Sequence, residues 1–152
     1  MLQETSSPVA ERELRASRLF KAPRPLVYKM WTEPEHIAKW WGPRGFTTTI
    51  QAMDVRPGGE WRFILHGPDG TDYPNHTVYE ELAPPERLVL RHVSWPHHRM
   101  HIDFTEAEGG TGVKVHMVFE SEADFQKVVL EYKADKGLRE NLDRLEEHIA
   151  SL

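Results

Sequence analysis

The chain has 152 residues, of which 39% are hydrophobic and 28% charged, a composition typical of one globular domain that is large enough to bury its own core. It contains no cysteine, which excludes disulfide frameworks and thiolate chemistry and favours a reducing, cytoplasmic location. The net charge of −5 gives no support for nucleic-acid binding, and no apolar run approaches the roughly 20 residues that cross a bilayer.

The N-terminal stretch MLQETSSPVAERE is polar and lacks the apolar segment of a signal peptide. We therefore expect residues 1–12 to form a flexible leader and residues 13–152 to form a single domain. The domain opens with ELRASRLF at residues 13–20, where apolar residues alternate with polar or smaller ones. This period of two predicts a strand.

Two short helices are expected after the prolines of KAPRP, because proline suits the first turn of a helix. Thr32 is the expected N-cap of the second helix, with Pro34 just inside it. This helix ends in KWWGPRGF, where Gly42 stands at the position that favours a left-handed residue. Neighbouring helical positions point about 100° apart, so Trp40 and Trp41 cannot share one direction. We expect one of them to pack beneath the sheet as an anchor and the other to face a cavity mouth or solvent.

Residues 46–119 change to short alternating runs separated by turn residues such as RPGG, GPDG, APPE and EGGTG. The expected strands cover residues 46–55, 60–66, 71–82, 87–93, 99–107 and 113–119. No helical pattern intervenes to permit a parallel crossover, so the strands predict an antiparallel meander.

The chain closes with a long helical pattern that starts near Ser121, which resembles an N-cap with Asp124. Its polar residues, Arg144 among them, are expected to face solvent, and Gly137 predicts a bend or a close approach to the sheet. The order of elements favours an α+β fold, with a curved antiparallel sheet of about six to seven strands wrapped on one long helix. One helix leaves part of the concave face uncovered, which predicts an internal cavity closed at one end by the two short helices.

Four segments together resemble a known superfamily: RLFKAPRPLVYKMWTEPEHIAKWWGP, DVRPGGEWRF, YEELAPPERLVL and KGLRENLDRLEEHI. The arrangement is similar to the START-like, birch-pollen-allergen-like fold (the SRPBCC superfamily) and, within it, to homologues of the activator of the heat-shock chaperone ATPase. The resemblance implies a helix-grip domain with a mostly apolar cavity. Leu138 stands where the family often has tryptophan, and Thr77 where it often has glycine. The superfamily includes small-molecule carriers, cyclase-like relatives and co-chaperone domains, so it leaves function open.

No nucleophile elbow, zinc-protease, P-loop or dinucleotide-binding motif is present. If HHRMH begins a strand, His98 and His101 point to opposite faces, and His97 and His101 lie about 13 Å apart. One ion cannot be chelated by that strand alone. A cross-strand set drawn from His76, His92, His101 and His116 stays open. We expect no metal site and no cofactor.

Most aromatic residues are expected in the core, and those near the open end of the cavity are expected to line a ligand site. The expected lining residues are Trp40, Trp41, Trp61, Phe63, Tyr79, His92, Trp95, Phe104 and Met117. Tyr79, His92 and Trp95 are the strongest of these, because each joins an apolar body to a polar tip.

The sequence thus favours a protein that binds a small apolar or amphipathic molecule without catalysing a reaction. One alternative is a protein-interaction module of the chaperone-activator type. Another is a cyclase or hydrolase that uses histidine with aspartate or glutamate in the cavity. Unpaired strand edges also leave a homodimer open.

Overall fold

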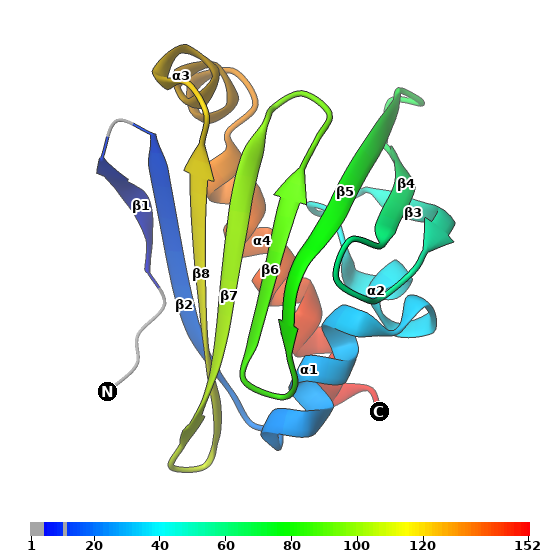
Figure 1. Cartoon of the computed structure of the whole chain (residues 1–152), viewed down its shortest axis with the longest axis vertical. Coiled ribbons are helices and arrows are strands. Elements are labelled where there is room, and N and C mark those ends of the chain that lie inside the picture. Colours follow the sequence, from blue (N-terminus) through cyan, green and yellow to red (C-terminus); the bar gives the residue numbers. More distant parts are fainter. Residues whose placement is uncertain (1–4, 11) are drawn as a thin grey trace.

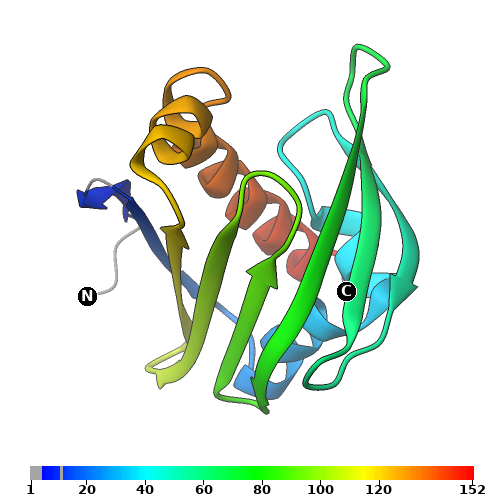
Figure 2. The same cartoon turned by 45° about the horizontal axis from the view of Figure 1, so that its top comes forward.

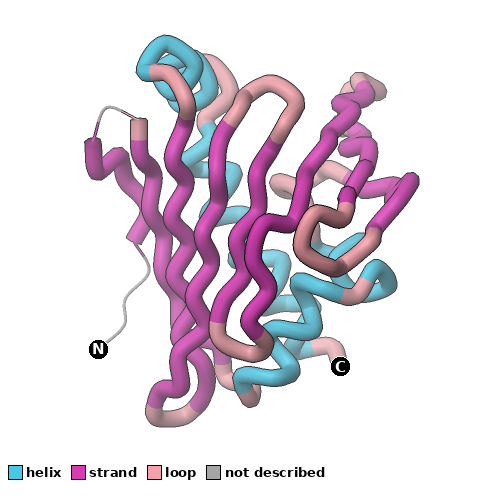
Figure 3. Tube along the Cα trace, viewed as in Figure 1, coloured by secondary structure: helices cyan, strands magenta, loops and turns pink. Residues whose placement is uncertain are grey.

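The computed structural model of the chain describes residues 5–10 and 12–152. Its centre is an eight-stranded antiparallel sheet with the order β1-β2-β8-β7-β6-β5-β4-β3 (Figure 1). The strands are β1 (Thr5–Ala10), β2 (Glu13–Phe20), β3 (Thr47–Met53), β4 (Glu60–His66), β5 (Asp72–Ala83), β6 (Arg87–His92), β7 (His98–Ala107) and β8 (Gly110–Phe119). Strands β3 to β8 follow one another through short loops, which confirms the predicted meander (Figure 3).

The sheet continues beyond the expected strands at its N-terminal edge. Residues 5–10, expected to be part of a flexible leader, instead form β1, whose Thr5 lies opposite Ser17 of β2. Pairing through the backbone needs no apolar pattern, so the polar sequence gave no sign of this strand. Residues 1–4 and 11, also in the expected leader, lie outside the described residues.

Four helices complete the α+β fold: α1 (Arg24–Thr32), α2 (Pro34–Trp40), α3 (Glu122–Leu130) and α4 (Ala134–Ala150). α4 crosses the concave side of the sheet (Figure 2), and α1 and α2 cover the sheet at one end. The expected long C-terminal helix is α4, but the helical pattern that starts near Ser121 is not continuous, because it breaks at residues 131–133, where Lys133 adopts a left-handed φ of 53°. Gly137 lies within α4, beside the side chain of Pro43.

The helix ends show which sequence signals hold. Oγ of Ser121 accepts a hydrogen bond from the backbone N–H of Asp124 (3.0 Å), as the predicted cap requires. Thr32 is not a cap, since it belongs to α1 and its hydroxyl donates to the carbonyl oxygen of Tyr28 (3.1 Å). Proline at the first position of α2 places Glu33 at the cap instead.

The core fills the space between the concave face of the sheet and the helices. Strands β7 and β8 contribute alternate residues such as Ile102 and Val115, and α4 contributes Leu138, Leu142 and Leu145, all of them buried. Among the described residues, no helix is long and apolar enough to span a membrane.

Candidate functional site

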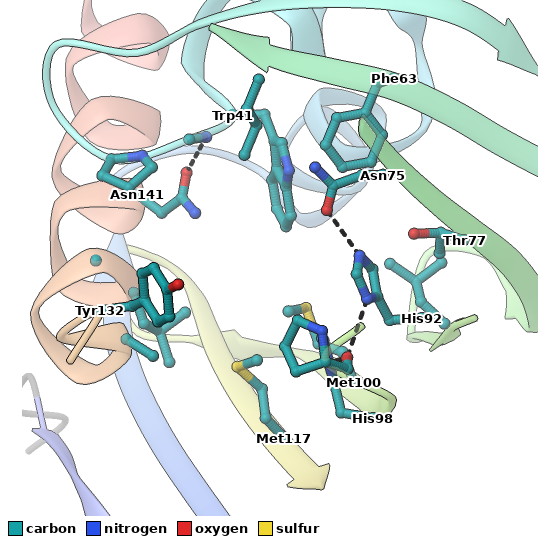
Figure 4. Close-up of a pocket in the computed structure, with 18 of the residues that line it drawn as sticks. Trp41, Phe63, Asn75, Thr77, His92, His98, Met100, Met117, Tyr132 and Asn141 are labelled. Carbon is teal, nitrogen blue, oxygen red and sulfur yellow. Dashed lines mark hydrogen bonds between the residues drawn. The ribbon is translucent and has the colours of Figure 1, made fainter. Parts of the chain in front are cut away.

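A pocket of about 230 Å³, here called the inner chamber, lies between the concave face of the sheet, the first turns of α4 and the loop after α2 (Figure 4). Most of its lining is apolar or aromatic. The lining residues are Trp41, Gly42, Pro43, Trp61, Phe63, Leu65, Asn75, Thr77, Leu90, His92, Pro96, His98, Met100, Met117, Tyr132, Ala134, Gly137, Leu138 and Asn141. No Asp, Glu, Lys or Arg from the described part of the chain is among them.

A second hollow of about 470 Å³, the outer chamber, continues from the first and shares Pro43, Asn75, His98 and Tyr132 with it, among others. Its further residues include Phe46, Tyr73, Trp95, Phe119 and Val128. Three large aromatic side chains at these chambers are solvent-exposed: Tyr73 (39%), Trp95 (44%) and Tyr132 (58%). The two chambers therefore form one mostly apolar depression with an aromatic rim.

The adjacent tryptophans at the end of α2 take different positions. Trp40 is fully buried, and its indole Nε1 donates to the carbonyl oxygen of Met30 (3.1 Å). Trp41 is half-buried, lines the inner chamber and meets Trp61 edge-on with ring centroids 5.2 Å apart. Trp40 is the anchor and Trp41 is a wall of the pocket.

α4 fixes the loop that carries Trp41. Nη1 of Arg144 donates to the carbonyl oxygens of Trp41 (3.3 Å), Gly42 (2.8 Å) and Pro43 (3.2 Å). Oδ1 of Asn141 accepts from the backbone N–H of Gly42 (2.7 Å). The expectation that Arg144 faces solvent was wrong, because the carbonyl groups at the C-terminal end of α2 attract its guanidinium.

Gly42 is required by this geometry. Its φ of 104° lies in the left-handed region, and a Cβ there would come within 3.0 Å of Cδ2 of Leu65. The prediction of a left-handed glycine at this position is confirmed.

Two histidines, His92 and His98, are among the polar residues that line the inner chamber. Nδ1 of His92 lies 3.0 Å from the carbonyl oxygens of Ser94 and Pro96, and Nε2 lies 2.7 Å from Oδ1 of Asn75; a neutral ring donates from only one of these nitrogens. Both ring nitrogens of His92 are thus engaged, and burial lowers its pKa. The ring of His98 stacks on that of His92 with centroids 4.8 Å apart, and its Nδ1 donates to the carbonyl oxygen of Pro96 (2.7 Å).

The family described as "Activator of Hsp90 ATPase homolog 1-like protein" matches residues 21–150. The chain belongs to this family. No curated protein matches it. A protein from Arthrobacter aurescens has the same fold with a TM-score of 0.90 and 21% identity, over 97% of this chain and 92% of that one. A protein from Rhodobacter sphaeroides also has this fold, with a TM-score of 0.86 and 20% identity over 99% of each chain. For an AHSA1-like protein from Aeromonas hydrophila, the TM-score is 0.75 and the identity is 18%, over 91% of this chain and 92% of that one.

The AHSA1-like fold brings together part of the expected ligand site. Trp41, Trp61, Phe63, His92 and Met117 line the inner chamber, and Trp95 lines the outer one.

Three expected residues, Trp40, Tyr79 and Phe104, lie in the core and line neither chamber. Trp40 is the last residue of α2, and Tyr79 and Phe104 lie on the part of the sheet that α1 and α2 cover. Phe104, for example, packs edge-on against Tyr28 of α1 with centroids 5.1 Å apart. Burial raises the pKa of the Tyr79 phenol.

Several lining residues were not predicted from the sequence, although the alternation along their strands places them on the inner face of the sheet. Asn75 and Thr77 share a face with Tyr79 on β5, and His98 shares one with Met100 on β7. Tyr132 lies at the helix break, which no sequence signal located. Thr77 and Leu138, the two residues expected to depart from the family pattern, both line the inner chamber.

The histidines of the cross-strand set considered for a metal do not converge on one point. His101 and His116 lie opposite each other on the outer face of the sheet, with ring centroids 5.9 Å apart, whereas His92 is on the inner face. Nη2 of Arg87 lies 3.1 Å from Nδ1 of His101, and Nε2 of His116 lies 2.5 Å from a Glu13 carboxylate oxygen. Within residues 5–10 and 12–152, no group of three or more potential metal ligands is assembled.

Proposed function

We propose that this AHSA1-like chain binds a small apolar or amphipathic molecule in the inner and outer chambers, without covalent chemistry. The observation that carries the proposal is the apolar inner chamber, walled by Trp41, Trp61 and Phe63 and open toward the rim. Small-molecule sites are typically hollows lined by apolar and aromatic side chains with a few polar groups that set orientation.

The polar groups support binding more than acid–base catalysis. The titratable side chains that line the inner chamber, among the described residues, are His92, His98 and Tyr132. Catalysis of the cyclase or hydrolase type would pair a histidine with a carboxylate inside the cavity. The inner lining supplies no such carboxylate from the described chain.

A fluorescence titration with a dye tests this proposal. N-phenyl-1-naphthylamine, a neutral aromatic dye, should bind saturably to the wild-type protein with a rise in its emission and in the melting temperature of the protein. Ala134 lines both chambers, so Ala134→Trp should fill the passage and abolish binding. The matched control is Ala150→Trp at the exposed end of α4, which should bind as the wild type does. Equal binding by the wild type and a folded Ala134→Trp variant would refute the site.

A second candidate function is a protein-interaction module that contacts a chaperone of the Hsp90 class, as the family description suggests. It is favoured by the exposure of Tyr73, Trp95, Leu130 and Tyr132, since exposed apolar clusters mark interaction surfaces. Purified Hsp90 should then bind the wild type and lose affinity for a Trp95→Ser, Tyr132→Ser double variant. Absence of Hsp90 binding to the wild type would remove this candidate.

A further inference from the structure

We propose that the inner chamber selects uncharged aromatic molecules that carry a hydroxyl group, and that this hydroxyl donates a hydrogen bond to Nε2 of His98. This inference rests on the proposed function and names the class of ligand. It follows from the charge of the lining, from the hydrogen bonds already made by its polar atoms, and from the row in which those atoms lie.

The lining excludes a charged ligand. The inner chamber contains no Asp, Glu, Lys or Arg from the described residues, and the outer chamber adds only the exposed Asp72. A carboxylate or an ammonium group that entered would leave water without gaining an opposite charge, which is unfavourable. The N-terminal end of α4 lies at the chamber, but Asp135 in its first turn offsets the positive end of the helix dipole.

His98 offers an acceptor. A carbonyl oxygen can only accept, so the proton of neutral His98 resides on Nδ1, which donates to Pro96. Burial, followed by the neighbouring His92, lowers the pKa of His98 to about 3, which keeps the ring neutral at pH 7. Nε2, on the other edge of the ring, is then an unprotonated acceptor, and it has no hydrogen-bond partner among the described residues.

A second polar atom lies in the same row. Thr77 is opposite His92 on β5 and β6, and His92 is opposite His98 on β6 and β7, all on the inner face. Thr77 is only 4% exposed, lines the inner chamber, and its hydroxyl makes no hydrogen bond within the described chain. Because neighbouring strands are about 4.8 Å apart, the Thr77 hydroxyl and the His98 ring are separated by roughly two strand spacings. His92, which is already engaged at both nitrogens, lies between them (Figure 4).

The walls around this row suit a flat ring system. Trp41, Trp61 and Phe63 form an aromatic wall, and the sulfur-containing side chains of Met100 and Met117 lie across the chamber (Figure 4). Aromatic rings pack well edge-on against tryptophan and against methionine sulfur. The ligand class is therefore a neutral aromatic with a hydroxyl donor, and not a carboxylate, such as a fatty acid or an aromatic acid, or a protonated amine.

Three probes that share one bicyclic ring test the inference at pH 7: naphthalene, 2-naphthol and 2-naphthoate. 2-Naphthol, which is neutral, should bind about tenfold more tightly than naphthalene, as one added hydrogen bond allows. 2-Naphthoate, which is charged, should bind at least tenfold more weakly than 2-naphthol. His98→Phe keeps an apolar ring and removes the acceptor, so it should lower the affinity for 2-naphthol to that for naphthalene. His101→Phe, on the outer face of the sheet, should leave the preference unchanged.

The outcomes separate the two proposals. The inference is overturned, and the proposed function stands, if N-phenyl-1-naphthylamine binds but 2-naphthol binds no more tightly than 2-naphthoate. The same holds if 2-naphthol binds no more tightly than naphthalene. If the dye and all three probes fail to bind, both fail. The comparison of probes on the wild-type protein decides even if His98→Phe does not fold.

Discussion

At the scale of single residues, Arg144 shows how one side chain fixes the wall of the pocket. Its guanidinium donates to the carbonyl oxygens of three successive residues, Trp41, Gly42 and Pro43, directly after α2. A cation at this end of a helix also meets the negative end of the helix dipole. The position of Trp41 thus depends on a residue that lies about a hundred positions later in the chain.

Arg144→Met keeps much of the length of the side chain and removes its donors. We expect the free energy of unfolding to fall by about 1–3 kcal/mol, because the carbonyl group of Gly42 loses its hydrogen-bond donor and those of Trp41 and Pro43 keep only Thr48 and Phe46 as donors. Urea unfolding measures the change. Arg139→Met, which removes a long ion pair with Asp135 on the surface of α4 (4.0 Å), should change stability by less than about 0.5 kcal/mol. An equal loss in both variants would show that the loop does not depend on Arg144.

Buried histidines make stability depend on pH. Burial lowers the pKa values of His92, His98 and His148 below that of an unfolded histidine, about 6.5. Below pH 6.5 the unfolded chain therefore binds more protons than the folded chain, so stability falls as the pH falls.

We expect the free energy of unfolding to decrease between pH 7 and pH 5, by up to about 1.4 kcal/mol per pH unit for each of the buried residues His92 and His98. In His98→Phe the decrease should be shallower, because one of these groups is gone. Urea unfolding at several pH values provides the measurement. A slope for the variant that equals that of the wild type would show that His98 can be protonated freely in the folded protein.

At the scale of elements, the loop after α2 joins the helical layer to the sheet. Gly42 allows the chain to turn there, and α4 holds the turn through Asn141 and Arg144. α4 therefore both covers the core and positions the wall of the inner chamber. A change in this loop should affect stability and ligand binding together.

Gly42→Ala tests that coupling. A side chain at this residue meets both an unfavourable φ of 104° and a close contact with Leu65, so we expect a loss of about 2 kcal/mol or more and weaker dye binding. Gly58→Ala is the matched control, because Gly58 also has a positive φ (81°) but no atom within 4 Å of its Cβ position. That variant should lose only about 1 kcal/mol, from the backbone alone. If the two variants lose the same stability, packing against Leu65 is not important.

Much of this architecture could be predicted from the sequence, because period-two alternation in strands such as 60–66 and 113–119 is strong. The break before α4 could not, since Lys133 adopts a left-handed conformation that glycine or asparagine usually marks. Parity alone placed residues on the inner face, but it could not tell which of them α1 and α2 cover. For that reason Tyr79 and Phe104 were expected at the cavity and lie in the core, whereas Thr77 and His98 were missed.

At the scale of the whole molecule, the curved sheet, α4 and the two short helices enclose a core that is complete at one end and hollow at the other. α1 and α2 close the first end, and the break between α3 and α4 lies beside the chambers, where Tyr132 and Ala134 form part of the lining. Family membership establishes this architecture, and the proposals on function rest on the lining of the chambers. β1 and β3 are the edge strands of the sheet, and pairing of two copies through such an edge stays a prediction.

The five tryptophans allow the central claim, that the chambers are the binding site, to be tested directly. Trp41 and Trp61 line the inner chamber and Trp95 the outer one, whereas Trp31 and Trp40 are buried in the core. In a titration with N-phenyl-1-naphthylamine followed by NMR of the indole N–H groups, the signals of Trp41, Trp61 and Trp95 should shift most and those of Trp31 and Trp40 least. Saturable binding that leaves the signals of Trp41 and Trp61 unchanged, or no binding at all, would contradict the account.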